Sequence, residues 1–107
     1  MNILLVCACG SSTSLLMQNM KENLSADESN WNIEALSISE AKAKFGLYDY
    51  VLMAPQVKFQ TNMVKELCKD IPQITIINVP SIDFGRCNGK GVLDLIRNDL
   101  KKQIIKN

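Results

Sequence analysis

Histidine is absent from this sequence of 107 residues. Its absence excludes Ser–His and Cys–His nucleophilic pairs, histidine metal ligands and a phosphohistidine formed on the chain itself. Any covalent step carried by this chain must therefore use a thiol, a hydroxyl, an amine or a carboxylate.

The sequence also lacks an excess of charge of either sign. Twelve basic and eleven acidic residues give a net charge of +1, so the composition offers no electrostatic argument for binding nucleic acid. The longest basic run is Lys101–Lys102, which argues against a basic patch for a membrane surface. No apolar stretch approaches the length of a transmembrane helix, and no basic leader precedes an apolar segment at the N-terminus. We therefore expect a cytoplasmic protein without direct membrane insertion.

The four cysteines do not have the spacing of a metal site. Cys7 and Cys9 are separated by one residue, whereas Cys68 and Cys87 are nineteen positions apart, which does not suit the second half of a zinc site. In a cytosolic chain such thiols are more often reduced than paired. We therefore expect no metal ion and no cofactor.

Strand-like and helix-like segments alternate along the chain. Apolar runs predict strands at Asn2–Val6, Trp31–Ile38, Asp49–Ala54 and Gln73–Val79. Helical spacing of apolar residues predicts helices over Thr13–Leu24, Lys58–Asp70 and Gly89–Ile105, and a shorter helix that Ser39 caps and Gly46 ends. This alternation predicts one domain over residues 1–107, an α/β three-layer sandwich with a four-stranded parallel sheet and helices on both faces. The first, third and fourth strands are apolar on both faces and are expected to be central, whereas the second is expected near an edge.

The stretch ILLVCACGSSTSLL places the thiol of Cys7 at the end of the first predicted strand. Ligands of open α/β sheets bind beyond the carboxyl ends of the strands. Free N–H groups in a loop of small residues, together with the positive end of the next helix, bind anions and favour the thiolate form of a nearby cysteine. A cysteine at a strand end is often only packed, but the small residues that follow favour a reactive one. We predict that Cys7 is a nucleophile for phosphorus, in a phosphate-binding loop of Ala8, Cys9, Gly10, Ser11, Ser12, Thr13 and Ser14.

Other phosphate-binding and thiol-dependent sites fit this loop less well. It lacks the Gly-Lys-Ser/Thr of a nucleotide P-loop and the G-x-G-x-x-G of a dinucleotide site. A cysteine-dependent phosphatase or arsenate reductase using the same thiol is the alternative. However, Thr13 stands where the Cys-x5-Arg loop of low-molecular-weight tyrosine phosphatases has arginine, and no Asp-Pro pair supplies their general acid. A redox module using Cys7 and Cys9 ranks last, because one intervening residue would strain the disulfide.

Three segments of the chain resemble a known family. VCACGSSTSLL resembles the loop of the B components of bacterial sugar phosphotransferase systems of lactose/cellobiose (N,N′-diacetylchitobiose) type. DYVLMAPQVKF resembles their third strand and the Gly/Ala-Pro-Gln turn after it, and IDFGRCNGKGVLDLI resembles the entry to their last helix. The resemblance runs almost from end to end. It departs from the usual pattern where Ser11 replaces Met, Cys9 replaces Ala or Gly, Phe84 replaces Tyr and Asn88 replaces Asp.

The resemblance implies a phosphatase-like fold and a phosphotransferase function. Cys7 would accept a phosphoryl group from a phosphohistidine of the A component. It would then pass the group to a cellobiose-, lactose- or chitobiose-like sugar bound by the membrane C component during uptake. The imidazole would thus belong to the partner, which agrees with the absence of histidine. The missing arginine and acid also fit, because a carrier must hold a phosphocysteine without hydrolysing it.

Overall fold

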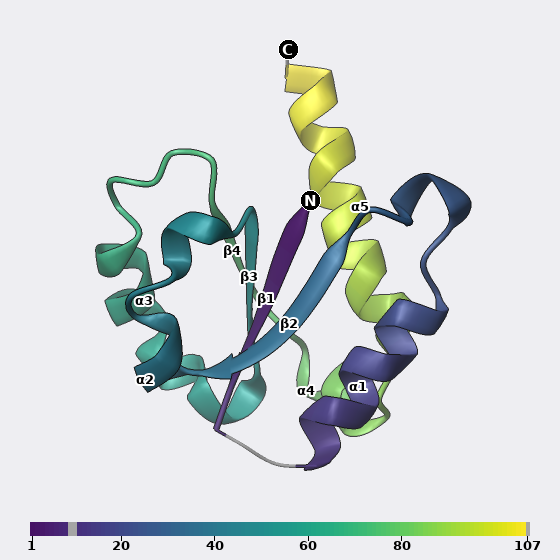
Figure 1. Ribbon diagram of the computed structural model, residues 1–107, viewed down its shortest axis with the longest axis horizontal. Coiled ribbons are helices and arrows are strands. Elements are labelled where there is room, and N and C mark those ends of the chain that lie inside the picture. The colour runs from purple at the N-terminus through teal and green to yellow at the C-terminus, as the bar shows by residue number, and fades with distance from the viewer. Residues whose placement is uncertain (9–10, 107) are drawn as a thin grey trace.

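A four-stranded parallel sheet forms the centre of the protein in this computed structural model, which describes residues 1–8 and 11–106 (Figure 1). The strands are β1 (Asn2–Cys7), β2 (Asn32–Ser37), β3 (Tyr50–Met53) and β4 (Thr75–Asn78). They lie in the order β2-β1-β3-β4, and every neighbouring pair is parallel. The predicted parallel sheet is therefore confirmed, with β1 in its interior.

Helices cover both faces of the sheet, which confirms the predicted three-layer architecture (Figure 1). One face carries α1 (Ser11–Glu22) and α5 (Gly89–Lys106), and the other carries α2 (Ile38–Ala41) and α3 (Thr61–Leu67). Helix α4 (Ser81–Gly85) and the 3₁₀-helices η1 (Ala26–Glu28), η2 (Phe45–Leu47) and η3 (Pro55–Gln60) complete the described chain. None of the helices in the described ranges has the length and hydropathy needed to cross a membrane. Both Met1 and the end of α5 lie towards the amino edge of the sheet, away from the end of β1.

The two inner strands form the core. All four residues of β3 are buried, and so are the five residues of β1 from Ile3 to Cys7. Strand β2 lies at an edge, as expected, but the prediction of a central fourth strand is wrong, because β4 lies at the opposite edge. Its apolar residues Ile76 and Ile77 pack against the core without being fully buried. The apolar residues of a strand indicate that helices cover both of its faces. They do not indicate whether the strand has a neighbour on each side, so an edge strand such as β4 can have the same composition as a central one.

Several helix boundaries differ from the prediction. Helix α1 begins at Ser11 rather than Thr13, and the predicted helix over Lys58–Asp70 is divided into η3 and α3. The short helix α2 is capped by Ser37, so the prediction of a cap at Ser39 is wrong. Ser37 Oγ accepts a hydrogen bond from the backbone N–H of Glu40 at 3.3 Å, and the Glu40 carboxylate accepts one from the backbone N–H of Ser37 at 3.2 Å. This reciprocal pair is a capping box, which leaves Ser39 inside the helix.

Helices α1 and α5 meet at Gly89 without room for a side chain. The Gly89 N–H donates to Asn19 Oδ1 at 2.7 Å. A Cβ atom on Gly89 would lie 2.3 Å from the backbone nitrogen of Met20 and 2.5 Å from the carbonyl carbon of Asn19. The start of α5 is therefore held directly against the backbone of α1, the helix that follows Cys7.

A partly buried ion pair fastens the connection between α1 and β2 to α5. The Arg97 guanidinium donates to both carboxylate oxygens of Glu28, at 2.7 and 2.8 Å, and to Asp94 at 2.9 Å. The hydrogen bond from Arg97 is the largest cause that lowers the pKa of Glu28 to about 2. Such two-pronged contacts combine charge with fixed geometry, so they fix η1 against the last helix.

Candidate functional site

Cys7 ends the inner strand β1 at the carboxyl edge of the sheet. Its exposed fraction is 7%, and its Sγ donates to the carbonyl oxygen of Leu36 in β2 at 3.8 Å. In the strand register Cys7 lies opposite Ser37. The thiol therefore lies at the edge where parallel sheets bind ligands, turned partly towards the neighbouring strand.

The predicted phosphate-binding residues follow Cys7 along the chain. Ala8 is exposed, whereas Cys9 and Gly10 lie outside the described residues. Ser11, Ser12, Thr13 and Ser14 form the first turn of α1 and are not part of the loop before it. The first four N–H groups of an α-helix have no acceptor within the helix, and this end carries a partial positive charge. The backbone from Ser11 to Ser14 is thus placed at the anion-binding end of a helix of 12 residues.

Two of these hydroxyl residues face different surroundings. Ser14 is exposed, whereas the exposed fraction of Thr13 is 5%. Thr13 occupies the position of the arginine in the Cys-x5-Arg loop. A long cationic side chain at this buried position would have to displace its neighbours or turn out towards solvent. The first turn of α1 therefore offers backbone donors without a guanidinium.

The exits of the neighbouring strands form the rim beside Cys7. On the β2 side lie Ser37 and Glu40, and hydrogen bonds from Ser37 hold the pKa of the exposed Glu40 carboxyl below its ordinary value. On the β3 side the Ala54 N–H donates to the carbonyl of Val6 at 2.9 Å, which brings the turn at Pro55 next to the end of β1. The sequence analysis missed Ser37 and Glu40 as neighbours of the thiol. Their Ser-x-x-Glu pattern signals a helix start, but only the strand register places that start beside Cys7.

A groove of about 400 Å³ lies between α1 and the segment after α4, and its lining does not include Cys7. The lining residues are Leu15, Gln18, Asn19, Glu22, Arg86 and Cys87. Polar and charged side chains of both signs make up most of this lining. The groove is therefore a surface feature along α1 from Leu15 to its last residue, Glu22, and Cys7 is not among its lining residues.

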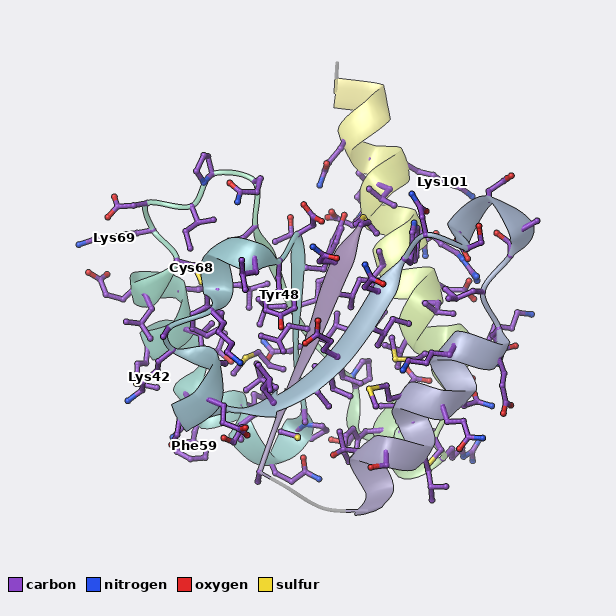
Figure 2. All side chains as sticks on the ribbon, viewed as in Figure 1. Lys42, Tyr48, Phe59, Cys68, Lys69 and Lys101 are labelled. Atoms are coloured by element: carbon purple, nitrogen blue, oxygen red, sulfur yellow. The ribbon has the colours of Figure 1, made fainter. Side chains whose placement is uncertain are left out.

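The remaining described cysteines differ from Cys7 in position. Cys68 is buried next to α3, on the helical layer opposite α1, and burial raises the pKa of its thiol (Figure 2). This environment favours a packing role for Cys68, because a buried apolar site disfavours the thiolate. Cys87 is partly exposed in the turn before α5. Cys7 is thus the one of these three that ends a strand of the sheet.

Known proteins are similar to this chain over most of its length. Residues 2–95 match the family described as "PTS system, Lactose/Cellobiose specific IIB subunit". A curated relative, the oligo-beta-mannoside-specific EIIB component of the PTS system of Bacillus subtilis (strain 168), is 34% identical over 89 residues, which are 82% of this chain and 84% of the relative. These matches confirm the resemblance drawn from the sequence.

Two solved structures of IIB components are also similar to this chain. The cellobiose-specific phosphotransferase IIB component of Borrelia burgdorferi is 38% identical, with a TM-score of 0.71, over 92% of this chain and 89% of that one. The lactose-specific IIB component domain of Streptococcus pneumoniae has a TM-score of 0.78 at 17% identity, over 92% of this chain and 95% of that one. At that identity the second likeness concerns the fold alone.

Proposed function

Because this chain belongs to the lactose/cellobiose-specific IIB subunits of the sugar phosphotransferase system, we propose that Cys7 is the residue that carries the phosphoryl group. The observation that supports this role most directly is the position of the thiol. Cys7 ends an inner strand immediately before the segment that leads into α1. The chain also contains no histidine that could carry the group instead.

The proposed reaction has two transfers. In the first, the P–N bond to a histidine of the A component breaks, an S–P bond to Cys7 Sγ forms, and the thiol proton passes to the released imidazole. In the second, a hydroxyl oxygen of the sugar on the membrane C component bonds to phosphorus while the S–P bond breaks. As the S–P bond breaks, the hydroxyl proton passes to the Cys7 sulfur, directly or through water, which regenerates the thiol for the next cycle.

The residues after Cys7 would hold the phosphoryl oxygens in both transfers. We assign this role to Ala8, Cys9, Gly10, Ser11, Ser12, Thr13 and Ser14, mainly through backbone N–H groups. Backbone donors aimed at an oxyanion stabilise it in place. The thiol hydrogen bond from Cys7 to Leu36 must be given up, since a sulfur bonded to phosphorus has no proton to donate.

A carrier fits this site better than a hydrolase does. Hydrolysis needs a group that binds the equatorial phosphoryl oxygens during attack by water, together with a general acid or base. In the Cys-x5-Arg phosphatases that group is the arginine, and here its position is occupied by Thr13, which is buried. The phosphocysteine is therefore expected to persist until an acceptor arrives.

The partners follow from the same role. We propose the A component as donor, and as acceptor the C component with a sugar of the cellobiose, lactose or chitobiose class. The family, which is described as lactose/cellobiose specific, and relatives named for oligo-beta-mannoside and cellobiose support this sugar class. We further propose that residues 1–107 act as one B domain in the cytoplasm.

Intact-mass spectrometry tests the proposal directly. The wild-type chain, mixed with a phosphorylated A component, is expected to gain one phosphoryl group, and Cys7→Ser is expected to gain none. Cys9→Ser, Cys68→Ser and Cys87→Ser serve as matched controls and should be phosphorylated like the wild type. Normal phosphorylation of Cys7→Ser would show that the proposal is wrong.

A further inference from the structure

Three of the exposed large apolar side chains belong to elements that start at the carboxyl edge of the sheet. Among the described residues the exposed large apolar side chains are Leu15, Leu47, Phe59, Met63, Leu67 and Ile82. Leu15, Phe59 and Ile82 have exposed fractions of 58%, 79% and 59%. Each belongs to an element that begins just after the carboxyl end of a strand, namely α1 after β1, η3 after β3 and α4 after β4.

These three side chains come from separate elements that converge on one edge. Figure 2 labels Phe59 at the end of the molecule where β1 leads into α1, and Figure 1 places α4 and the start of α1 at that same end. A single exposed apolar side chain is normal on a protein surface and needs no explanation. Three such side chains on three elements that each start at the edge where Cys7 lies are informative, because no shared sequence period brings these elements together.

The size of a standard interface links these side chains to Cys7. Transfer requires the donor atom to approach the sulfur to within about 3.5 Å, so a donor protein must be centred over the thiol. A standard interface covers about 800 Å² on each partner, which corresponds to a disc of roughly 16 Å radius. The protein itself measures 37 × 33 × 22 Å. A footprint of that size centred on Cys7 therefore reaches all the elements at this edge.

We propose that Leu15, Phe59 and Ile82 are the apolar contacts with which the A component docks over Cys7, an inference that rests on the proposed function. The donor must bring a side-chain imidazole to a thiol with an exposed fraction of 7%. The protein surface around that histidine must therefore seat against the rim. A few apolar contacts with polar surroundings carry most of the binding energy of a typical interface. A small number of such contacts suits a partner that has to dissociate after each transfer.

The groove beside Leu15 extends this surface. Glu22 and Arg86 line it together with Leu15, and Arg86 lies four positions after Ile82, one turn further along the chain. Charged side chains at the border of an interface affect the rate of association more than its strength. Substitutions of the apolar residues are therefore expected to change the affinity for the A component more than substitutions of Glu22 or Arg86 do.

The test compares the concentration dependence of phosphorylation among matched variants. Initial rates of phosphocysteine formation are measured against the phosphorylated A component of the same organism's lactose/cellobiose-type system. Leu15→Ala, Phe59→Ala and Ile82→Ala are each expected to raise KM at least about 5-fold, the effect of a contact worth about 1 kcal/mol, with kcat nearly unchanged. Phe59→Leu, which keeps an apolar side chain, should restore most of the affinity.

Leu47→Ala is the matched control. Leu47 has an exposed fraction of 64% but lies at the opposite edge, where its carbonyl accepts from the side chain of Asn2 at 3.0 Å. This variant should keep the wild-type KM. All four substituted side chains are more than half exposed, so the unfolding midpoints should match that of the wild type.

The outcomes separate this inference from the proposed function. Unchanged KM in all three variants, with normal transfer to Cys7, would overturn the docking surface and leave the carrier role intact. A defect confined to transfer onto the sugar would assign the surface to the C component and also overturn the inference. Failure of the wild-type chain to accept a phosphoryl group at any concentration of the A component would refute the proposed function itself.

Discussion

Gly89→Ala should destabilise the protein, although the same change is favourable in most helices. Replacing glycine with alanine at a compatible helical position usually stabilises a protein by about 0.4–1 kcal/mol, because the unfolded chain loses freedom. No described glycine of this chain has a positive φ, so the backbone conformation itself would accept alanine at Gly89.

The contact with α1 opposes this gain. The added Cβ would lie 2.3 Å from the Met20 backbone nitrogen and 2.5 Å from the Asn19 carbonyl carbon. These are main-chain atoms that cannot rotate away, so α1 and α5 would have to separate by roughly 1 Å to reach an ordinary contact distance. Overpacking of this kind typically costs about 1–3 kcal/mol. The separation would also stretch the 2.7 Å hydrogen bond from Gly89 to Asn19, which adds about 1 kcal/mol.

The net expectation is a loss of about 1–3 kcal/mol in the free energy of unfolding, which lowers Tm by roughly 4–8 °C for each kcal/mol in a domain of this size. Urea unfolding followed by far-UV circular dichroism measures the loss. Gly85→Ala is the matched control, because a Cβ at Gly85 meets nothing within 4 Å, and it should be neutral or slightly stabilising. If Gly89→Ala proves as stable as Gly85→Ala, the reasoning from close approach is refuted.

Two further predictions concern charge and chemistry. Glu28→Gln should lower the free energy of unfolding at pH 7 by about 1–3 kcal/mol, because it breaks a charge-assisted pair with Arg97. The pKa of Glu28 is lowered from 4.5 to about 2 in the folded protein, so the carboxylate contributes its full stability above pH 4.5 and loses it as the pH falls towards 2. Urea titrations at several pH values should therefore show the gap between wild type and Glu28→Gln narrowing below pH 4.5, and a constant gap would contradict the assignment. Separately, the wild-type chain should not turn over a chromogenic aryl phosphate, as followed by absorbance, since Thr13 replaces the clamping arginine; steady turnover would favour the phosphatase alternative.

Local sequence patterns predicted the sheet and the position of Cys7, because both depend on short-range signals. Apolar runs of strand length gave β1 and β3, and the small residues after Cys7 marked a turn into a helix. Helix α4 was missed, since its five residues are too few to show a helical period. The edge position of β4 was missed for a different reason, since strand order depends on pairing within the sheet rather than on composition.

Contacts between distant segments could not be read from the sequence. Glu28 and Arg97 are 69 positions apart, and nothing local indicates that they meet. The closeness of Gly89 to the backbone of α1 likewise arises only when α5 docks. Ser37 and Glu40 form a recognisable Ser-x-x-Glu pattern, but their place beside Cys7 follows from the pairing of β1 with β2. The position of Cys7 at the end of a strand was thus predictable, whereas the residues beside it on the neighbouring strands were not.

The arrangement of the chain ends has a practical consequence for building probes of this protein. Met1 and the last turns of α5 lie towards the amino edge of the sheet, whereas Cys7 lies at the carboxyl edge (Figure 1). An affinity tag, a fluorophore or a fused protein attached at either end would project away from the thiol. Immobilised chains would then present the edge that carries Cys7 to solution, so surface-based binding measurements could use either end as the anchor.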